Sequence, residues 1–163
     1  MNSESLSPDI QPWLTILEAT PRRIASAVEG FENARLHFKL DESVWSANDI
    51  LAHLRACADV WSKSMTSMIE QDHPTLRYVS PRMWIKKTDY LTLEFHPLLL
   101  IFTAQRSDLV TWLKALSPEQ WARGATFTGT TQGRNHNVFT YMRRMAQHEL
   151  VHCEEIEALL KES

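Results

Sequence analysis

Glycine is the residue whose distribution most constrains this chain. The 163 residues contain only four glycines, and three of them, Gly124, Gly129 and Gly133, fall within ten residues of one another. A sheet protein of this length normally needs more turn glycines between its strands. The rest of the chain carries long runs in which apolar residues recur at steps of three and four, the period of an amphipathic helix. The distribution therefore predicts an all-α protein.

The first half of the chain contains two of the expected long helices. One covers about residues 9–30, with a restart at Pro21, because proline suits the first turn of a helix. The other begins after Ser46, a good N-cap, and Asp49 three residues later gives an acidic version of the capping box. Its apolar stripe ends near residue 71.

The second half contains the other two. A third helix covers about 89–116, where Pro97 either kinks the helix or displaces its start. The last helix covers about 138–161. The stretches 72–88 and 117–137 are long connections without a sustained period, and they allow a crossover in place of simple up-and-down topology. Four amphipathic helices in a chain of this length predict a four-helix bundle.

Length and charge narrow the class of protein. The chain suits one domain over residues 1–163, and its net charge of −3 offers no basic surface for nucleic acid. The longest apolar run, 98–102, is far too short to span a membrane, and the N-terminus does not have the pattern of a signal peptide. Two cysteines, Cys57 and Cys153, are too few for a disulfide scaffold. We therefore expect a cytoplasmic protein.

Two histidines in the last predicted helix have the spacing of metal ligands. His148 and His152 lie four residues apart, so both imidazoles project from one helix face. Imidazoles on a buried face need partners for their nitrogens, and one shared metal ion provides them. The alternative is that both are ordinary core or surface histidines with separate hydrogen bonds. The same face carries apolar neighbours, namely Tyr141, Met145, Ile156 and Leu159.

A third imidazole would complete a three-nitrogen site with an open position, which is typical of catalytic metal sites. The candidate is His53, which lies on the flank of the apolar stripe that follows Ser46, one turn before Cys57. Spacing alone leaves the association of His53 with the C-terminal pair open.

The segment His148-Glu149-Leu150-Val151-His152 also matches the zinc peptidase pattern H-E-x-x-H, in which Glu149 would be the general base. Such peptidases take their third ligand from a position downstream of the motif. Only eleven residues follow His152, and none of them is histidine. A peptidase is therefore the weakest of the functional alternatives.

Three segments, in this order and at these intervals, resemble the DinB/YfiT-like superfamily of metalloenzymes. The first is Trp45-Ser46 leading to Asp-Ile-Leu-Ala-His-Leu at 49–54. The second is Phe102 with Arg106 and Leu113, and the third is the closing Ala-Gln-His-Glu-Leu-Val-His of 146–152, followed by Ile156. Together the segments span nearly the whole chain.

The resemblance implies a four-helix bundle of up-down-down-up topology, which is often dimeric, so a homodimer is expected. It also implies one divalent metal ion held by His53, His148 and His152. The donor chemistry suits Zn²⁺, Ni²⁺, Mn²⁺ or Fe²⁺. Characterised relatives include thiol-dependent transferases and isomerases, which implies a low-molecular-weight thiol as a second reactant.

The leading hypothesis is therefore a metal-dependent hydrolase or thiol transferase that acts on a small molecule. A non-enzymatic bundle with a structural or sensing metal is the alternative. Four side chains near the expected site have two interpretations each. Glu149 is either a base or a solvated or supporting carboxylate, and Asp49 either orients His53 or only caps its helix. Cys57 is either a fourth ligand or a core residue, and Arg106 either binds an anion or forms a structural ion pair.

Overall fold

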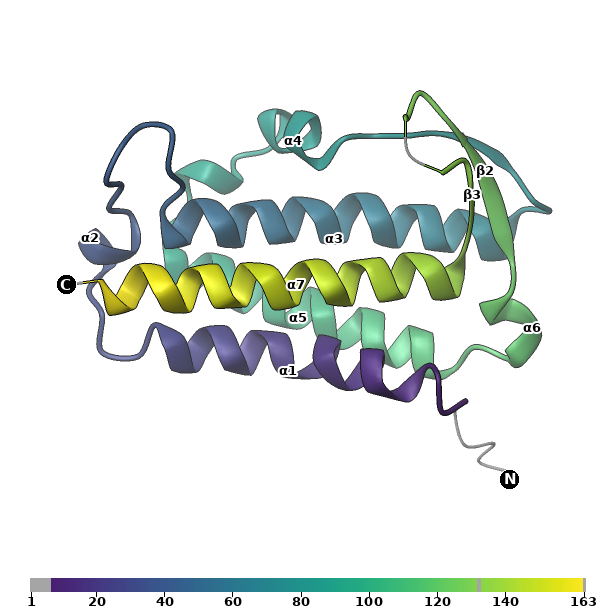
Figure 1. Ribbon diagram of the computed structural model, residues 1–163, viewed down its shortest axis with the longest axis horizontal. Coiled ribbons are helices and arrows are strands. Elements are labelled where there is room, and N and C mark those ends of the chain that lie inside the picture. The colour runs from purple at the N-terminus through teal and green to yellow at the C-terminus, as the bar shows by residue number, and fades with distance from the viewer. Residues whose placement is uncertain (1–6, 132, 163) are drawn as a thin grey trace.

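Four long helices, packed side by side, form the body of the molecule. The computed structural model describes residues 7–131 and 133–162. The long helices are α1 (Gln11–Ala27), α3 (Ala47–Glu70), α5 (Phe95–Lys114) and α7 (Val138–Lys161) (Figure 1). Both α1 and α3 pack against α5 and α7, so α1 and α3 occupy opposite corners of the bundle. The all-α, four-helix prediction is confirmed.

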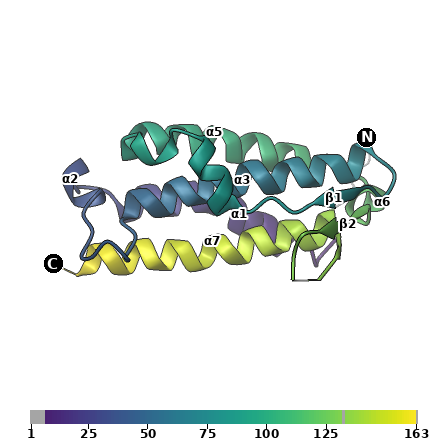
Figure 2. The same cartoon turned by 90° about the horizontal axis from the view of Figure 1, so that it is seen from above.

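The helix directions follow the up-down-down-up order. Helices α3 and α5 run the same way, opposite to α1 and α7 (Figures 1 and 2). A chain that joins two parallel helices must return along their whole length, and the segment between α3 and α5 does so over the outside of α3. This crossover contains strand β1 (Thr75–Arg77), helix α4 (Pro81–Trp84) and two short 3₁₀ turns, η1 (Ile85–Lys87) and η2 (Tyr90–Thr92).

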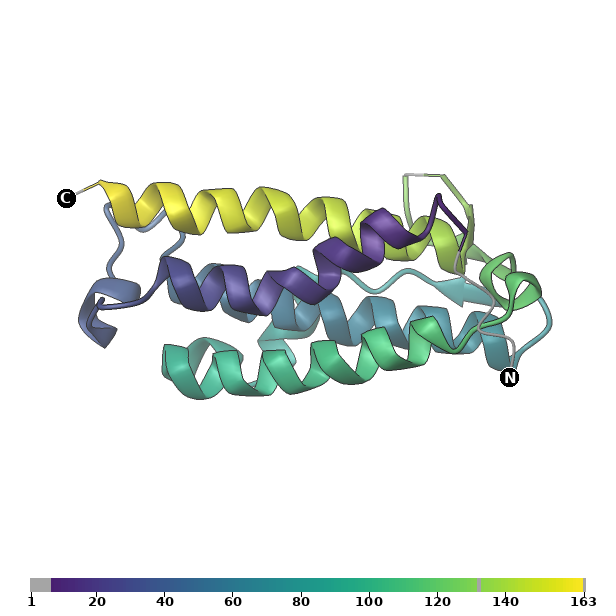
Figure 3. The same cartoon turned by 90° about the horizontal axis from the view of Figure 1, so that it is seen from below.

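The helix boundaries follow the capping chemistry. The hydroxyl of Ser46 accepts a hydrogen bond from the Asp49 backbone N–H, and Asp49 accepts one from the Ser46 N–H, as the capping box predicts. The predicted restart of the first helix is wrong: α1 continues through Pro21 and is bent along its length (Figure 3). Pro97 lies in the first turn of α5, where no intrahelical N–H bond is lost, so it displaces the start instead of kinking the helix.

A small sheet closes one end of the bundle, where an irregular connection was predicted. Strand β2 (Gly124–Thr128) pairs in parallel with β1 and antiparallel with β3 (Asn135–Asn137). A Cβ atom at Gly124 would lie 2.5 Å from the His136 carbonyl oxygen, so this register requires glycine. The remaining short helices are α2 (Asn33–Leu36) and α6 (Pro118–Trp121).

The apolar core is interrupted halfway along the bundle by buried polar residues. One apolar cluster lies toward the sheet, and the other lies toward the end of α7. Between them, each long helix contributes a polar side chain to a belt that we call the polar layer: Thr20, His53, Arg106, His148, Glu149 and His152. Within the described residues, no helix combines the length and the apolar character needed to cross a lipid bilayer.

Candidate metal centre

Three imidazoles converge in the polar layer where α3 packs against α7. The Nε2 atom of His148 lies 3.3 Å from Nε2 of His53 and 3.0 Å from Nε2 of His152. His53 and His148 are 95 positions apart in sequence, so this arrangement exists only when the two helices pack together. The structure therefore brings together all three histidines that the sequence singled out.

The spacing of these nitrogens fits ligands of one ion. Two nitrogens at ~2.1 Å from a tetrahedral ion lie ~3.4 Å apart, close to the separations of 3.3 and 3.0 Å around His148. Cys57 adds a fourth donor, with its Sγ 3.5 Å from Nε2 of His53. Among the described residues, the set whose ligand atoms all lie within 4.8 Å of one another is His53, Cys57 and His148, and His152 adjoins this set through its contact with His148.

Neighbouring side chains fix the orientation of two of the rings. Nδ1 of His152 lies 2.7 Å from Oε2 of Glu155. A carboxylate only accepts, so the proton of a neutral His152 is on Nδ1 and the Nε2 lone pair faces the other histidines. The His148 ring lies edge-on to Trp61, with 5.1 Å between ring centroids, and its Nδ1 has no hydrogen-bond partner among the described residues.

Burial keeps His53 and His148 unprotonated. Desolvation, with smaller contributions from His152 and Arg82, lowers the pKa of His53 to about 4. Desolvation and the two neighbouring imidazoles lower the pKa of His148 to about 3. Neutral imidazoles with converging lone pairs are the form that binds a metal ion.

Glu149 points away from this cluster. It lies in the core, forms an ion pair with Arg106 of α5, and each of the two side chains is only 2% exposed. Burial raises the pKa of Glu149, and the Arg106 guanidinium opposes that shift. The expectation of a solvated carboxylate is wrong, because residue 149 follows His148 by a turn of 100° that directs it inward. The structural ion pair expected for Arg106 is confirmed. A catalytic role for Glu149 stays a prediction that this burial does not favour.

Asp49 and Cys57 have defined surroundings as well. Asp49 completes the capping box and binds Lys39 at 2.9 Å, which agrees with the capping interpretation. Cys57 is buried, and desolvation raises the pKa of its thiol. It belongs to the apolar cluster that packs toward the sheet.

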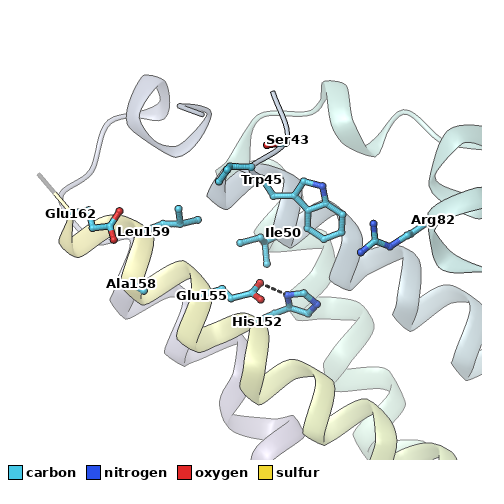
Figure 4. A pocket seen from close by; sticks show the side chains of 10 residues that line it. Ser43, Trp45, Ile50, Arg82, His152, Glu155, Ala158, Leu159 and Glu162 are labelled. Carbon is cyan, nitrogen blue, oxygen red and sulfur yellow. Dashed lines mark hydrogen bonds and ion pairs between the residues drawn. The ribbon is translucent and has the colours of Figure 1, made fainter. Parts of the chain in front are cut away.

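A cavity of about 540 Å³ opens beside His152. Figure 4 shows that Trp45, from the segment before α3, and Arg82 of α4 face it together with His152 of α7. Sequence patterns assigned no function to these two residues, since Trp45 was noted only as part of the family resemblance and Arg82 lies in a connection without a period. Trp84 of the same short helix is not in the lining of this cavity and donates to Asp59 at 3.0 Å.

Comparison with known proteins agrees with this architecture. One solved structure, YfiT from Bacillus subtilis, superposes with a TM-score of 0.82 at 19% identity, over 97% of this chain and 90% of that one. It is described as a probable metal-dependent hydrolase with an unusual four-helix bundle topology. No curated protein sequence matches the chain significantly. The profile of the DinB superfamily matches residues 16–156, so the chain belongs to the DinB superfamily.

Proposed function

We propose that this protein is a metal-dependent enzyme in which His53, His148 and His152 bind one divalent ion. The observation that carries the proposal is the convergence of three Nε2 atoms around His148, at 3.3 and 3.0 Å, beside a cavity of about 540 Å³. A purely structural metal site has no need of such a cavity. The cavity is large enough for a small-molecule substrate.

The set of three histidines fits the surroundings better than the set with Cys57. The Glu155 carboxylate orients His152, as carboxylates do for metal-binding histidines. Cys57 is buried in the apolar cluster that packs toward the sheet, whereas His152 lines the cavity. We therefore assign Cys57 to the core.

The proposed reaction is either hydrolysis of a small molecule or transfer of a group between a small molecule and a thiol. An ion held by three neutral imidazoles would keep its full charge, so it would supply Lewis acidity, lower the pKa of a bound water toward ~7, or bind a thiol as its thiolate. The donor set suits Zn²⁺, Ni²⁺, Mn²⁺ or Fe²⁺. The chain's own contribution is to orient His152 through Glu155 and to cover the site with Trp45, whose ring centroid lies 4.9 Å from that of His53.

The peptidase alternative lacks support from the geometry. Its base would be Glu149, which is bound to Arg106 in the core, and its third ligand would come from beyond residue 152. Of the four glutamates beyond residue 152, Glu155 contacts Nδ1 of His152, the ring nitrogen that faces away from the other histidines.

Metal analysis of single variants tests the proposal. His152→Ala is expected to lose most of the metal that the purified wild-type protein carries, with its helical circular dichroism nearly unchanged, because the ring contributes a ligand and little packing. His53→Ala and His148→Ala should behave alike. The matched controls are His96→Ala, which removes an exposed histidine, and Cys57→Ala; both should keep the metal.

Two results would contradict this assignment. Full metal occupancy in His152→Ala would exclude His152 as a ligand. Loss of metal in Cys57→Ala would show that the Cys57 thiol is a ligand. Chelation separates catalysis from structure: a catalytic ion leaves a folded metal-free protein, whereas a sharp fall in melting temperature indicates a structural ion.

A further inference from the structure

Arg82 is the one basic side chain in the lining of the cavity beside His152, within the described residues. Its guanidinium lies over the face of the Trp45 ring, 4.7 Å from the centroid. In the described part of the chain it has no carboxylate partner. Arg23 and Arg106, by contrast, each form an ion pair with a glutamate. A guanidinium that stacks on a ring keeps its N–H donors free for an anion.

The short helix that carries Arg82 is anchored. The neighbouring Trp84 donates from Nε1 to Oδ2 of Asp59 on α3, at 3.0 Å, and Tyr90 donates to the same oxygen at 2.6 Å. Pro81, the first residue of the helix, and Ile85, which follows its last residue, are both buried. These contacts hold α4 against α3, so Arg82 has a defined place at the rim of the cavity.

The charges of the cavity are not evenly distributed. Figure 4 places Arg82 near His152 and Trp45, and Glu162 at the opposite end beyond Leu159. Glu155, between the two ends, is occupied by the His152 ring. Ile50 and Leu159 give the middle of the cavity an apolar wall. An anionic group is therefore favoured at the Arg82 end alone.

We propose that Arg82, stacked on Trp45, is the residue that binds the anionic group of the substrate. The substrate class is then a small carboxylate whose apolar part lies along Ile50 and Leu159, with its charged end between Arg82 and the histidines. This inference rests on the proposed function for its meaning in catalysis. It is nevertheless testable without a metal ion, because Arg82 is not among the proposed ligands.

The experiment compares an acid with its uncharged analogue, 3-phenylpropionate with 3-phenylpropanol. Their dissociation constants are measured from the tryptophan indole N–H signals in NMR titrations, first on metal-free and then on metal-loaded protein. The wild type is expected to bind the acid about tenfold more tightly than the alcohol. Arg82→Met should bring the two constants together, and Arg82→Lys should keep part of the difference.

The matched control is Arg144→Met. Arg144 also lies over a tryptophan, 5.4 Å from the Trp61 centroid, but it lines a different cavity. It should leave the preference for the acid unchanged, and both Met variants should keep the wild-type metal content.

Several outcomes would overturn the inference. The first is a wild type that does not prefer the acid, or binds neither compound. The second is an Arg144→Met variant as impaired as Arg82→Met, which would indicate a general effect of positive charge. The third is a preference in metal-loaded protein that does not depend on Arg82. Failure of the metal proposal would look different: the protein would carry no metal while the Arg82-dependent preference persisted.

Discussion

Two polar clusters lie at the same level of this bundle, and they satisfy their burial in opposite ways. On one side, Arg106 and Glu149 are buried to 2% exposure and neutralise each other. On the other side, His53, His148 and His152 direct like atoms at one another across 3.3 and 3.0 Å. In the first cluster the two opposite charges pair within the protein, while Nε of Arg106 and Oε2 of Glu149 have no hydrogen-bond partner among the described residues. In the second, the Nε2 atoms of three imidazoles face one another, and under the proposed function a cation from outside would complete it.

The adjacent residues His148 and Glu149 belong to different clusters. A step of 100° along α7 sends one side chain toward α3 and the next toward α5. A single helix thus serves an internal ion pair and a candidate metal site on neighbouring faces. The comparison teaches that burial of a charged group is not by itself a sign of function, since Arg106 and Glu149 are buried as an ion pair of the core. The three converging imidazoles are the better candidate for a functional site.

The largest loss of stability is expected from breaking the buried ion pair of Arg106 and Glu149. Arg106→Met leaves the Glu149 carboxylate buried without its partner, which should lower the free energy of unfolding by about 3–5 kcal/mol. The double variant Arg106→Met, Glu149→Leu should recover much of that loss. Urea denaturation measures both.

The control for this prediction is the half-exposed pair of Arg23 and Glu157, whose side chains are 34% and 30% exposed. Glu157→Gln should cost less than about 1 kcal/mol, because solvent already screens that pair. Equal losses in Arg106→Met and Glu157→Gln would remove the distinction between the buried and the surface pair.

Acid should act on the histidine cluster of the metal-free protein. The pKa values of His53 and His148, about 4 and about 3, lie below the ordinary 6.5, so the unfolded chain takes up protons first as the pH falls. The stability is therefore full above pH 6.5 and decreases toward pH 4. From pH 7 to pH 5 we expect a loss of about 2–4 kcal/mol, measured by urea denaturation at each pH.

The double variant His53→Gln, His148→Gln is the control for the acid experiment. It should lose much less stability over the same pH range, because glutamine does not titrate. A wild type whose stability is flat between pH 7 and pH 5 would show that these imidazoles are not held neutral by burial.

The smallest expected effect is on metal affinity, and it comes from removing the carboxylate that orients His152. Glu155→Ala removes the acceptor of the His152 Nδ1–H, and metal affinity should weaken by about tenfold, because carboxylates that orient metal-binding histidines contribute about this much. The neighbouring exposed residue gives the control, Glu154→Ala. Competition with a chromophoric chelator measures the affinity of both. Unchanged affinity in Glu155→Ala would assign the orientation of His152 to packing alone.

Helix pattern and capping predicted the bundle well. The N-cap pair Ser46 and Asp49 defined the start of α3, since capping is decided by residues close in sequence. The last helix, 138–161, has the predicted bounds. The small sheet escaped prediction because its strands are three to five residues long and pair across distant segments. The cluster of glycines was the available signal, since Gly124 makes room for the backbone of His136.

Local pattern predicted only part of the site. The i, i+4 spacing of His148 and His152 identified the pair on α7, and resemblance to a family linked His53 to it. The inward direction of Glu149 depends on packing between α5 and α7, which spacing does not encode. Trp45 and Arg82 meet only because the crossover passes over α3, so no local rule connects them.

The chain order of the histidines determines when the site comes into existence. His53 is made early, and His148 and His152 lie on the last of the long helices, 95 positions later for the first of them. During synthesis the ribosome must therefore release nearly the whole domain before three imidazoles can meet. If these histidines bind the proposed metal ion, a newly made chain has no complete site to load with the wrong ion, and uptake of metal would report finished folding.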